Sequence, residues 1–229
     1  MRLALKHALK VSARAVLFDL DGTLADTAPD LARALNRVRA AHGLGPMPVE
    51  TTRPYTSSGA RGLLKVGFGL EPEDARYEAL KSQFLEFYAA DICVDTRLFD
   101  GMAELLGQLE QAHLPWGVVT NKAEQFTLPL MQGLRLGTRA ACIVGGDTTA
   151  RAKPHPDPLL HAAAVLQLPP SACLYVGDDL RDVQAARAAG MPVLAAKYGY
   201  LGDGGSVESW QADAVIEHPR EVLEYLHAS

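Results

Sequence analysis

The chain has 229 residues, of which 48% are hydrophobic and 21% are charged, and its formal net charge is −5 at pH 7. These proportions are ordinary for a folded globular protein and exclude a disordered, collagen-like or coiled-coil chain. The acidic balance argues against a nucleic-acid partner, which would favour a basic surface. The length fits one or two domains of roughly 100 to 200 residues.

Three cysteines occur, Cys93, Cys142 and Cys173, and their spacing fits neither a disulfide framework nor a zinc site. Apolar runs stay well short of the roughly 18 to 20 residues of a membrane helix. The first residues lack the apolar stretch and small-residue cleavage site of a signal peptide. We therefore expect a cytoplasmic protein with no membrane partner.

Residues 1–14 place Arg2, Lys6, Lys10 and Arg14 among Leu, Ala and Val. Two interpretations of this segment are open. We favour a frayed, disordered extension ahead of the folded domains, and a short basic amphipathic helix is the alternative.

The first predicted strand covers residues 15–18, which are apolar throughout, as in a strand buried on both faces. From about residue 28 to residue 98 the sequence has helix signals and almost no strand signal. Asp30 is placed to cap a helix that ends at Gly43, and a second long helix is predicted over residues 72–90. Between them, residues 56–62 form a polar, flexible stretch. We expect this interval to be an inserted helical cap domain.

Beyond residue 98, apolar runs alternate with helical patterns, which is typical of parallel strands covered by helices. The predicted strands cover residues 116–119, 141–144, 173–176 and 192–195, with residues 213–216 as a candidate edge strand. The predicted helices cover residues 123–134, 157–166 and 180–189. The expected fold class is α/β, a doubly wound parallel sheet of the Rossmann-like kind. Its core would comprise residues 15–27 and 99–229, and the cap residues 28–98.

Polar residues follow four of the predicted strands, at the end where ligands bind in open α/β sheets. Directly after the first strand come Asp19 and Asp21, in the sequence Asp-Leu-Asp-Gly-Thr. In an extended segment both side chains point to the same side, and such a pair favours a cation with oxygen ligands, Mg²⁺ above all. We interpret one acid as a nucleophile and the other as a group that moves protons. For this motif by itself, a solvated turn is the alternative.

Two further segments offer groups that suit an anion. Thr120 and Asn121 follow the second strand of the core, and Thr120 has a hydroxyl and a backbone N–H for an anionic oxygen. Lys153 precedes a helix and carries a mobile positive charge. Taken singly, such a Thr is more often an ordinary helix N-cap, and a single Lys before Pro is usually a solvated side chain.

The fourth segment is acidic. After the strand at residues 173–176, the sequence Gly-Asp-Asp-Leu-Arg-Asp places Asp178, Asp179 and Asp182 within five residues. Such a concentration beside a buried strand has little structural benefit without a metal ion. Asp179 or Asp182 as a simple helix cap is the alternative.

Taken in order, these segments resemble the phosphatase branch of the haloacid dehalogenase superfamily. That branch carries Asp-x-Asp-Gly-Thr, a later Ser or Thr, a Lys and an acidic Gly-Asp-x-x-x-Asp motif. The resemblance covers nearly the whole chain from Ala15 and includes the position of the cap. It implies a phosphoglycolate phosphatase-like enzyme. Residues 57–61, 115–122 and 198–200 are more closely similar to bacterial N-acetylmuramic acid 6-phosphate phosphatases, so both substrates stay open.

The resemblance implies hydrolysis of a small-molecule phosphate ester through an aspartyl-phosphate intermediate. Asp19 is implied as the nucleophile and Asp21 as the general acid and base. Thr120, Asn121 and Lys153 are implied as the groups that bind the phosphate.

The resemblance also implies Mg²⁺ as the cofactor. Asp19, Asp178 and the backbone carbonyl of Asp21 would hold it, with Asp179 nearby. Arg61, in the polar stretch of the cap, is our prediction for the residue that contacts an acidic substrate, and a solvated surface arginine is the alternative.

Other classes of protein fit less well. A receiver-type signalling domain would be about half as long and would lack the helical insertion. A dehalogenase or phosphonatase would not be expected to keep Asp21, and a binding protein without catalysis would have lost at least one motif residue. A sugar-phosphate mutase keeps both acids and stays open. The sequence predicts neither the physiological substrate nor the oligomeric state.

Overall fold

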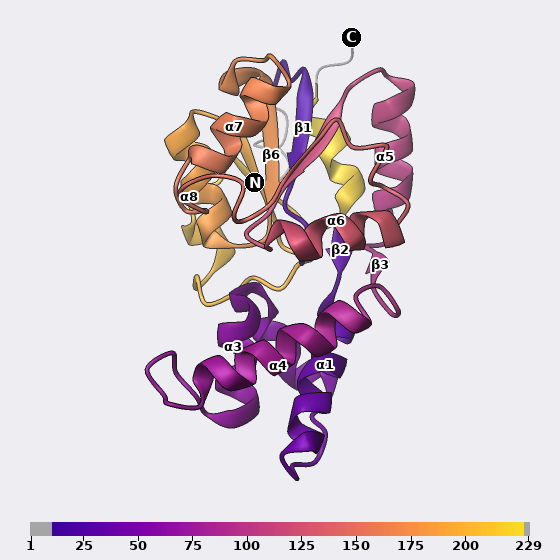
Figure 1. Ribbon diagram of the computed structural model, residues 1–229. Helices are drawn as coiled ribbons and strands as arrows, with labels where there is room; N and C mark the ends of the chain where they lie inside the picture. Colours follow the sequence, from indigo (N-terminus) through magenta and orange to yellow (C-terminus); the bar gives the residue numbers. More distant parts are fainter. Residues whose placement is uncertain (1–10, 227–229) are drawn as a thin grey trace.

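The computed structural model describes residues 11–226. The chain forms two lobes, a sheet flanked by helices and a smaller helical unit beyond the carboxyl ends of the strands (Figure 1). Residues 1–10, which make up most of the predicted extension, lie outside the described residues. Val11 is buried and its N–H donates to the Tyr225 carbonyl (2.8 Å), while the Arg14 N–H donates to the Ala172 carbonyl (2.7 Å). The chain is therefore attached to the sheet lobe from Val11 onward, earlier than residue 15.

Six parallel strands form the sheet, in the spatial order β5-β4-β1-β6-β7-β8. They are Ala15–Phe18 (β1), Trp116–Val119 (β4), Cys142–Val144 (β5), Cys173–Gly177 (β6), Val193–Ala196 (β7) and Ala214–Ile216 (β8). β1 lies inside the sheet, with Val16 opposite Trp116 of β4 and Leu174 of β6. Each predicted strand is found to within one residue at either end, and the doubly wound α/β class is confirmed.

Helices cover both faces of the sheet (Figure 1). They are α5 (Met102–Gln111), α6 (Glu124–Gly133), α7 (Asp157–Val165) and α8 (Leu180–Ala189), with the short 3-10 helices η2 (Pro170–Ala172), η3 (Val207–Ser209) and η4 (Pro219–Tyr225). Val16 and Phe18 pack against α5, α6 and η4, whereas Ala15 and Leu17 pack on the side of α7 and α8. Burial on both faces explains why these strands are apolar throughout. Helix α5 was not predicted, although its leucines follow a helical period.

The helical lobe falls within the interval expected to form a cap, and we refer to it as the cap. It contains α1 (Ala28–Ala41), α2 (Val49–Thr52), the 3-10 helix η1 (Arg53–Ser58), α3 (Gly59–Phe68) and α4 (Tyr77–Ala90). Leu35, Leu63 and Phe84 are fully buried where α1, α3 and α4 meet. The long helix predicted from residue 72 begins only at Tyr77, because the Asp74 carboxylate accepts the Glu71 N–H (2.7 Å) and closes a turn ahead of it.

Asp30 does not cap the first cap helix as predicted. The helix begins at Ala28, so Asp30 lies inside its first turn. The buried carboxylate instead accepts N–H bonds from the loop after α4, at Val94 (2.9 Å), Asp95 (2.8 Å) and Thr96 (3.1 Å). Burial opposes ionisation of Asp30, but these hydrogen bonds outweigh it and lower its pKa. Asp30 thus fixes the segment that returns to the sheet lobe.

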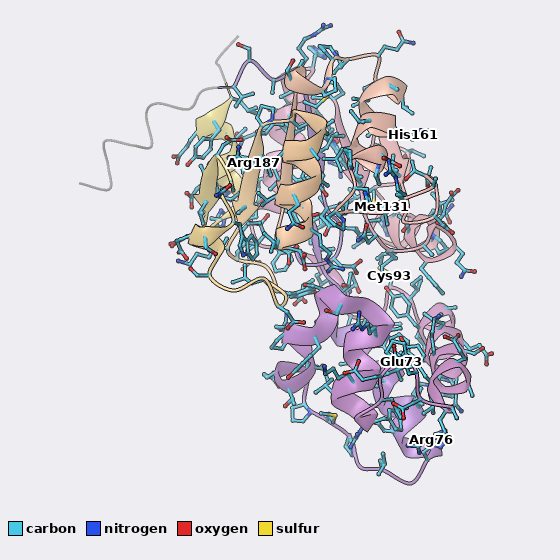
Figure 2. The ribbon with its side chains drawn as sticks, turned by 90° about the vertical axis from the view of Figure 1, so that its left-hand side faces the viewer. Glu73, Arg76, Cys93, Met131, His161 and Arg187 are labelled. Carbon is cyan, nitrogen blue, oxygen red and sulfur yellow. The ribbon has the colours of Figure 1, made fainter. Side chains whose placement is uncertain are left out.

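Two short strands, β2 (Ala25–Asp26) and β3 (Arg97–Leu98), pair in antiparallel fashion where the chain leaves and re-enters the sheet lobe. Figure 2 shows Cys93 at this junction, with Glu73 and Arg76 out in the helical lobe. The cap is therefore connected to the core by two adjacent segments only a few residues from the strand ends. Within residues 11–226, no helix combines the length and the apolarity needed to cross a membrane.

Candidate active site

The predicted site residues of the sheet lobe meet at one edge of the sheet. Asp19 follows β1, Thr120 follows β4, and Asp178 follows β6. These three strands are neighbours in the sheet and parallel, so their carboxyl ends bring the three residues together. A cavity of about 370 Å³ lies between this edge and the cap. Asp19 and Asp21 line it from below, and residues of η1, α3 and α4 line it from the cap.

Lys153 is the most heavily bonded side chain of the site. Its side chain is only 2% exposed, and its ammonium lies 2.9 Å from Asp19 Oδ1 and 2.7 Å from Asp182 Oδ1. It also donates to the Val119 carbonyl (3.0 Å) and the Tyr175 hydroxyl (2.9 Å). Burial by itself would lower the pKa of Lys153, but Asp182 and Asp19 outweigh it and raise the pKa, so the group is a fixed cation.

Asp178 is held by neutral donors. The Thr23 hydroxyl donates to its Oδ1 (2.7 Å) and the Tyr200 backbone N–H to its Oδ2 (2.8 Å). The first loop passes very close, because a Cβ on Gly22 would lie 2.2 Å from Asp178 Oδ2. Gly22 also has a φ of +88°, so the turn after Asp21 requires glycine both for its backbone and for this approach.

Three acids form a cluster that suits a metal ion. Carboxylate oxygens of Asp19, Asp178 and Asp182 all lie within 4.8 Å of one another. Burial raises the pKa of Asp19 to about 7, against the opposing effect of Lys153. Burial and the neighbouring Asp19 and Asp182 raise the pKa of Asp178 well above its usual range. One lysine does not balance this charge, and hard carboxylate donors fit a divalent cation. Asp19 and Asp178 follow the ends of neighbouring strands and are the candidates to hold it, and Asp182 is the third acid of the cluster.

Asp21 faces the cavity between the two lobes. Its carboxylate accepts the Thr27 hydroxyl and lies 3.1 Å from the ammonium of Lys122. Lys122, whose side chain is 10% exposed, also lies over the ring of Tyr88 in the cap, 4.7 Å from the ring centre. Burial opposes the charge on Lys122, but Asp21 outweighs it and raises the pKa of Lys122. Lys122 therefore links the second acid to the cap.

Asp179, a predicted metal neighbour, lines the cavity but is not one of the three clustered acids. Its two carboxylate oxygens accept from Nε and a terminal nitrogen of Arg181, each at 2.8 Å, and it caps α8. Arg181 reaches on to the cap, where it donates to the Ser57 carbonyl (2.7 Å). Burial opposes ionisation of Asp179, yet its bonds to Arg181 lower its pKa. This pair connects the start of α8 with the polar stretch of the cap.

Thr120 and Asn121 occupy different roles at the second strand end. Thr120 is buried and lines the cavity, and its hydroxyl accepts the Lys122 N–H (3.2 Å) while keeping its own proton to donate. The Asn121 amide pairs with the backbone of Lys153, donating to the carbonyl (2.9 Å) and accepting from the N–H (3.0 Å). Asn121 thus holds the Lys153 loop in place.

The structure does not bring Arg61 to the site. Arg61 lies in the first turn of α3 with an exposed side chain, and it is not among the residues that line the cavity. The cavity is lined instead by Lys81 of α4, which is 39% exposed and lies 3.4 Å from Glu78. Lys81 is therefore the cap cation nearest to where a substrate would bind.

Sequence reasoning assigned no role to Lys122 and considered Asp182 as one of three acids that suit a metal ion or as a helix cap, not as a partner of Lys153. Asp182 does take part in the capping box of α8, where it accepts the Asp179 N–H (3.0 Å), but it also fixes Lys153. The signal for both was present. Lys122 directly follows Thr120 and Asn121, and Asp182 is the second acid of the Gly-Asp-x-x-x-Asp motif.

Comparison with known proteins agrees with this geometry. A family model described as haloacid dehalogenase-like hydrolase matches residues 16–196. The chain is 42% identical over 217 residues to an N-acetylmuramic acid 6-phosphate phosphatase of Pseudomonas aeruginosa, covering 95% of this chain and 96% of that protein. It is 47% identical over 212 residues to a phosphoglycolate phosphatase of Xanthomonas campestris pv. campestris, covering 92% and 95%.

Among solved structures, the fold is similar to the crystal structure of a predicted phosphoglycolate phosphatase from Haemophilus somnus. The TM-score is 0.82 and the identity 26%, over 93% of this chain and 98% of that one. The family expected from the four motifs is thereby confirmed. The chain belongs to the haloacid dehalogenase-like hydrolases, among their phosphatases.

Proposed function

We propose that this phosphatase hydrolyses a small acidic phosphomonoester through a covalent phosphate on Asp19, with Mg²⁺ as its cofactor. One observation carries the proposal. Asp19 lies at the floor of the cavity, paired with the buried cation Lys153 and clustered with two further acids. This arrangement combines a nucleophile, a charge that attracts phosphate and ligands for a cation in one place.

The reaction has two steps. An oxygen of Asp19 attacks phosphorus, the bond between phosphorus and the ester oxygen breaks, and Asp21 donates a proton to the departing alcohol. A water oxygen then attacks the phosphorus of the aspartyl phosphate, Asp21 takes up the proton, and the bond to Asp19 breaks to release phosphate. Lys153 and the Thr120 hydroxyl stabilise the negative charge on the phosphoryl oxygens in both steps. Lys122 orients Asp21.

Mg²⁺ supplies, when bound, the positive charge that lets a phosphate dianion approach a cluster of carboxylates. Asp19 and Asp178 are the side chains that would hold it, together with the Asp21 carbonyl that the family pattern implies. Asp179 lines the same cavity and holds Arg181 in place beside it.

Two substrates named for the relatives are candidates, phosphoglycolate and N-acetylmuramic acid 6-phosphate. Both are carboxylates as well as phosphate esters, and Lys81 at the cavity supplies a cation for that second charge. The cytoplasm is the location that we propose for this activity.

The experiment measures phosphate release from both substrates and from p-nitrophenyl phosphate, with Mg²⁺ and with chelator. Rapid acid quenching followed by peptide mass analysis should find a phosphoryl group on the peptide that contains Asp19. Phosphate release that is unaffected by chelator and leaves Asp19 unmodified would overturn the proposal. A sugar-phosphate mutase would be revealed by a bisphosphate requirement and an isomeric product instead of inorganic phosphate.

A further inference from the structure

The cavity has an apolar wall opposite the acids. Leu31 of α1, Phe84, Leu85 and Tyr88 of α4, and Phe126 of the sheet lobe line it above the acids. Its volume, about 370 Å³, is that of a small-molecule pocket. If the phosphate of phosphoglycolate binds at Asp19, its two-carbon acid would leave most of this wall without contact.

Two of the hydroxyl groups on the cap side of the cavity are buried without a hydrogen-bond partner in the described part of the chain. Among the described residues, the buried side-chain oxygens and nitrogens all have hydrogen-bond partners except Tyr88 Oη and Ser57 Oγ. Both residues line this cavity, and both belong to the cap. Buried polar groups in proteins are nearly always paired, so two exceptions at one cavity call for an explanation.

Tyr88 is fixed in place by its ring. The ring stacks on Phe84 at 6.5 Å, packs against Phe126 at 5.7 Å, and lies under the Lys122 ammonium at 4.7 Å. This position of Lys122 over the ring is a cation–π contact, and the ammonium also interacts with the Tyr88 hydroxyl oxygen. Within residues 11–226, the hydroxyl has no hydrogen-bond partner of good geometry, and its own proton has no acceptor. Burial raises the pKa of Tyr88 to about 12, so its hydroxyl keeps a proton to donate at neutral pH.

Ser57 is fixed by its backbone. Its carbonyl accepts the hydrogen bond from Arg181, which is itself paired with Asp179. The Ser57 hydroxyl is therefore held at the mouth of the cavity by a contact from the sheet lobe, although the hydroxyl itself is unpaired.

We propose that the Tyr88 and Ser57 hydroxyls bind the alcohol part of the substrate, and that this part is a sugar-sized group with several polar atoms. The inference rests on the proposed phosphatase function and chooses within its substrate class. A pyranose ring presents hydroxyl or amide groups to both hydroxyls and covers the apolar wall with its carbon skeleton. The two-carbon acid of phosphoglycolate is too small to fill a cavity of about 370 Å³ and has no hydroxyl or amide group to pair with both hydroxyls.

The energetic consequence is a preference for the larger ester. A site with buried hydrogen-bonding groups rejects an analogue that leaves them unpaired, because their desolvation is then uncompensated. We expect kcat/KM for a sugar 6-phosphate such as N-acetylmuramic acid 6-phosphate to exceed that for phosphoglycolate by roughly ten-fold or more.

The test compares Tyr88→Phe and Ser57→Ala with wild-type enzyme on N-acetylmuramic acid 6-phosphate, phosphoglycolate and p-nitrophenyl phosphate. Each variant should lose roughly ten-fold in kcat/KM on the sugar ester, and several times less on p-nitrophenyl phosphate. Because no described residue gives the Tyr88 hydroxyl a hydrogen bond of good geometry, Tyr88→Phe should lower the melting temperature of the ligand-free protein by no more than about a degree or two, whereas loss of a structural hydrogen bond would lower it further. Tyr77→Phe, at the far end of the same helix, and Ser82→Ala, on its exposed side, are the matched controls and should keep wild-type kinetics.

A preference for phosphoglycolate, or equal losses on all three substrates, would overturn the inference and leave the phosphatase function standing. Failure to hydrolyse any of the three esters with Mg²⁺ would count against the function itself. In that case, calorimetry can test the inference without turnover, by measuring binding of the sugar ester to the Asp19→Asn variant. The sugar ester should bind roughly ten-fold more weakly when Tyr88→Phe is added, and equal binding would overturn the inference.

Discussion

The two walls of the cavity differ in how completely their polar groups are paired. On the sheet side, Lys153 has four oxygen partners and Asp178 has two donors. On the cap side, the hydroxyls of Tyr88 and Ser57 have none among the described residues. The groups that perform the reaction are thus fixed before a substrate arrives, as electrostatic catalysis requires. On the cap side, we propose that these two hydroxyls form their hydrogen bonds with the alcohol part of the substrate.

The strongest test of the sheet wall is Asp19→Asn. We expect a loss in kcat of at least about 10³-fold on every substrate, because an amide does not attack phosphorus. The fold should persist, since the amide removes a charge that burial disfavours. Phosphate release measures the activity, and circular dichroism measures the fold. Substantial activity in a variant whose mass excludes deamidation would contradict the covalent role of Asp19.

Metal binding sharpens the same comparison, with a readout that does not depend on turnover. Mg²⁺ should raise the melting temperature of the wild-type protein, as any ligand of the native state does. At a hundred-fold excess over Kd, the free energy of unfolding should increase by about 2.7 kcal/mol. Asp178→Asn should abolish most of this shift, whereas Asp100→Asn, an exposed acid of the same lobe, should retain it. An undiminished shift in Asp178→Asn would place the cation elsewhere.

Lys122 lies between the two walls, so its replacement should affect both. Lys122→Met should lower kcat roughly 10- to 100-fold on all substrates, because Asp21 loses the ammonium that orients it. Lys122→Arg should recover part of this loss at unchanged thermal stability, which a purely structural role would not explain. Lys65→Met, at an exposed lysine of the cap, is the control. Normal kcat in Lys122→Met would remove Lys122 from the mechanism.

The smallest effects are expected at the rim of the cap. Lys81→Ala should raise KM for a carboxylate-bearing ester by about two- to five-fold, the range of a solvent-exposed ion pair. Arg61→Ala, which alters an exposed side chain away from the cavity, should change KM by less than about two-fold. Steady-state kinetics on the same ester measure both. A larger loss for Arg61→Ala than for Lys81→Ala would restore the role that the sequence suggested for Arg61.

The two walls also differ in how far the sequence predicts them. Asp19, Thr120 and Asp178 are predictable because each directly follows an apolar run, and neighbouring parallel strands bring such positions together. The apolar runs in turn identify the strands, because a sheet covered on both faces leaves no alternation.

The cap contacts are not predictable in the same way. The side of α3 and α4 that turns to the cavity depends on how the helices pack on each other and on the sheet lobe. The sequence alone does not show which cap side chains face the cavity. We expected Arg61 there, but the cap side chains that line it include Lys81 and Tyr88 and not Arg61. Asp179 illustrates the same limit, because its spacing suits a metal neighbour, yet Arg181, two residues further on, pairs with it.

The hydrogen bonds of the site join parts of the chain that are far apart in sequence. The bond from Thr23 to Asp178 spans 155 positions, and the bond from the Thr27 N–H to the Tyr200 hydroxyl spans 173. Contacts of such separation form slowly, since a long loop must close before they can be made. During synthesis on a ribosome, the nucleophile and the entire cap emerge long before the acids that complete the site. Recovery of catalysis during refolding should therefore lag behind recovery of helical structure. An incomplete chain that ends before β6 lacks Asp178 and should be inactive.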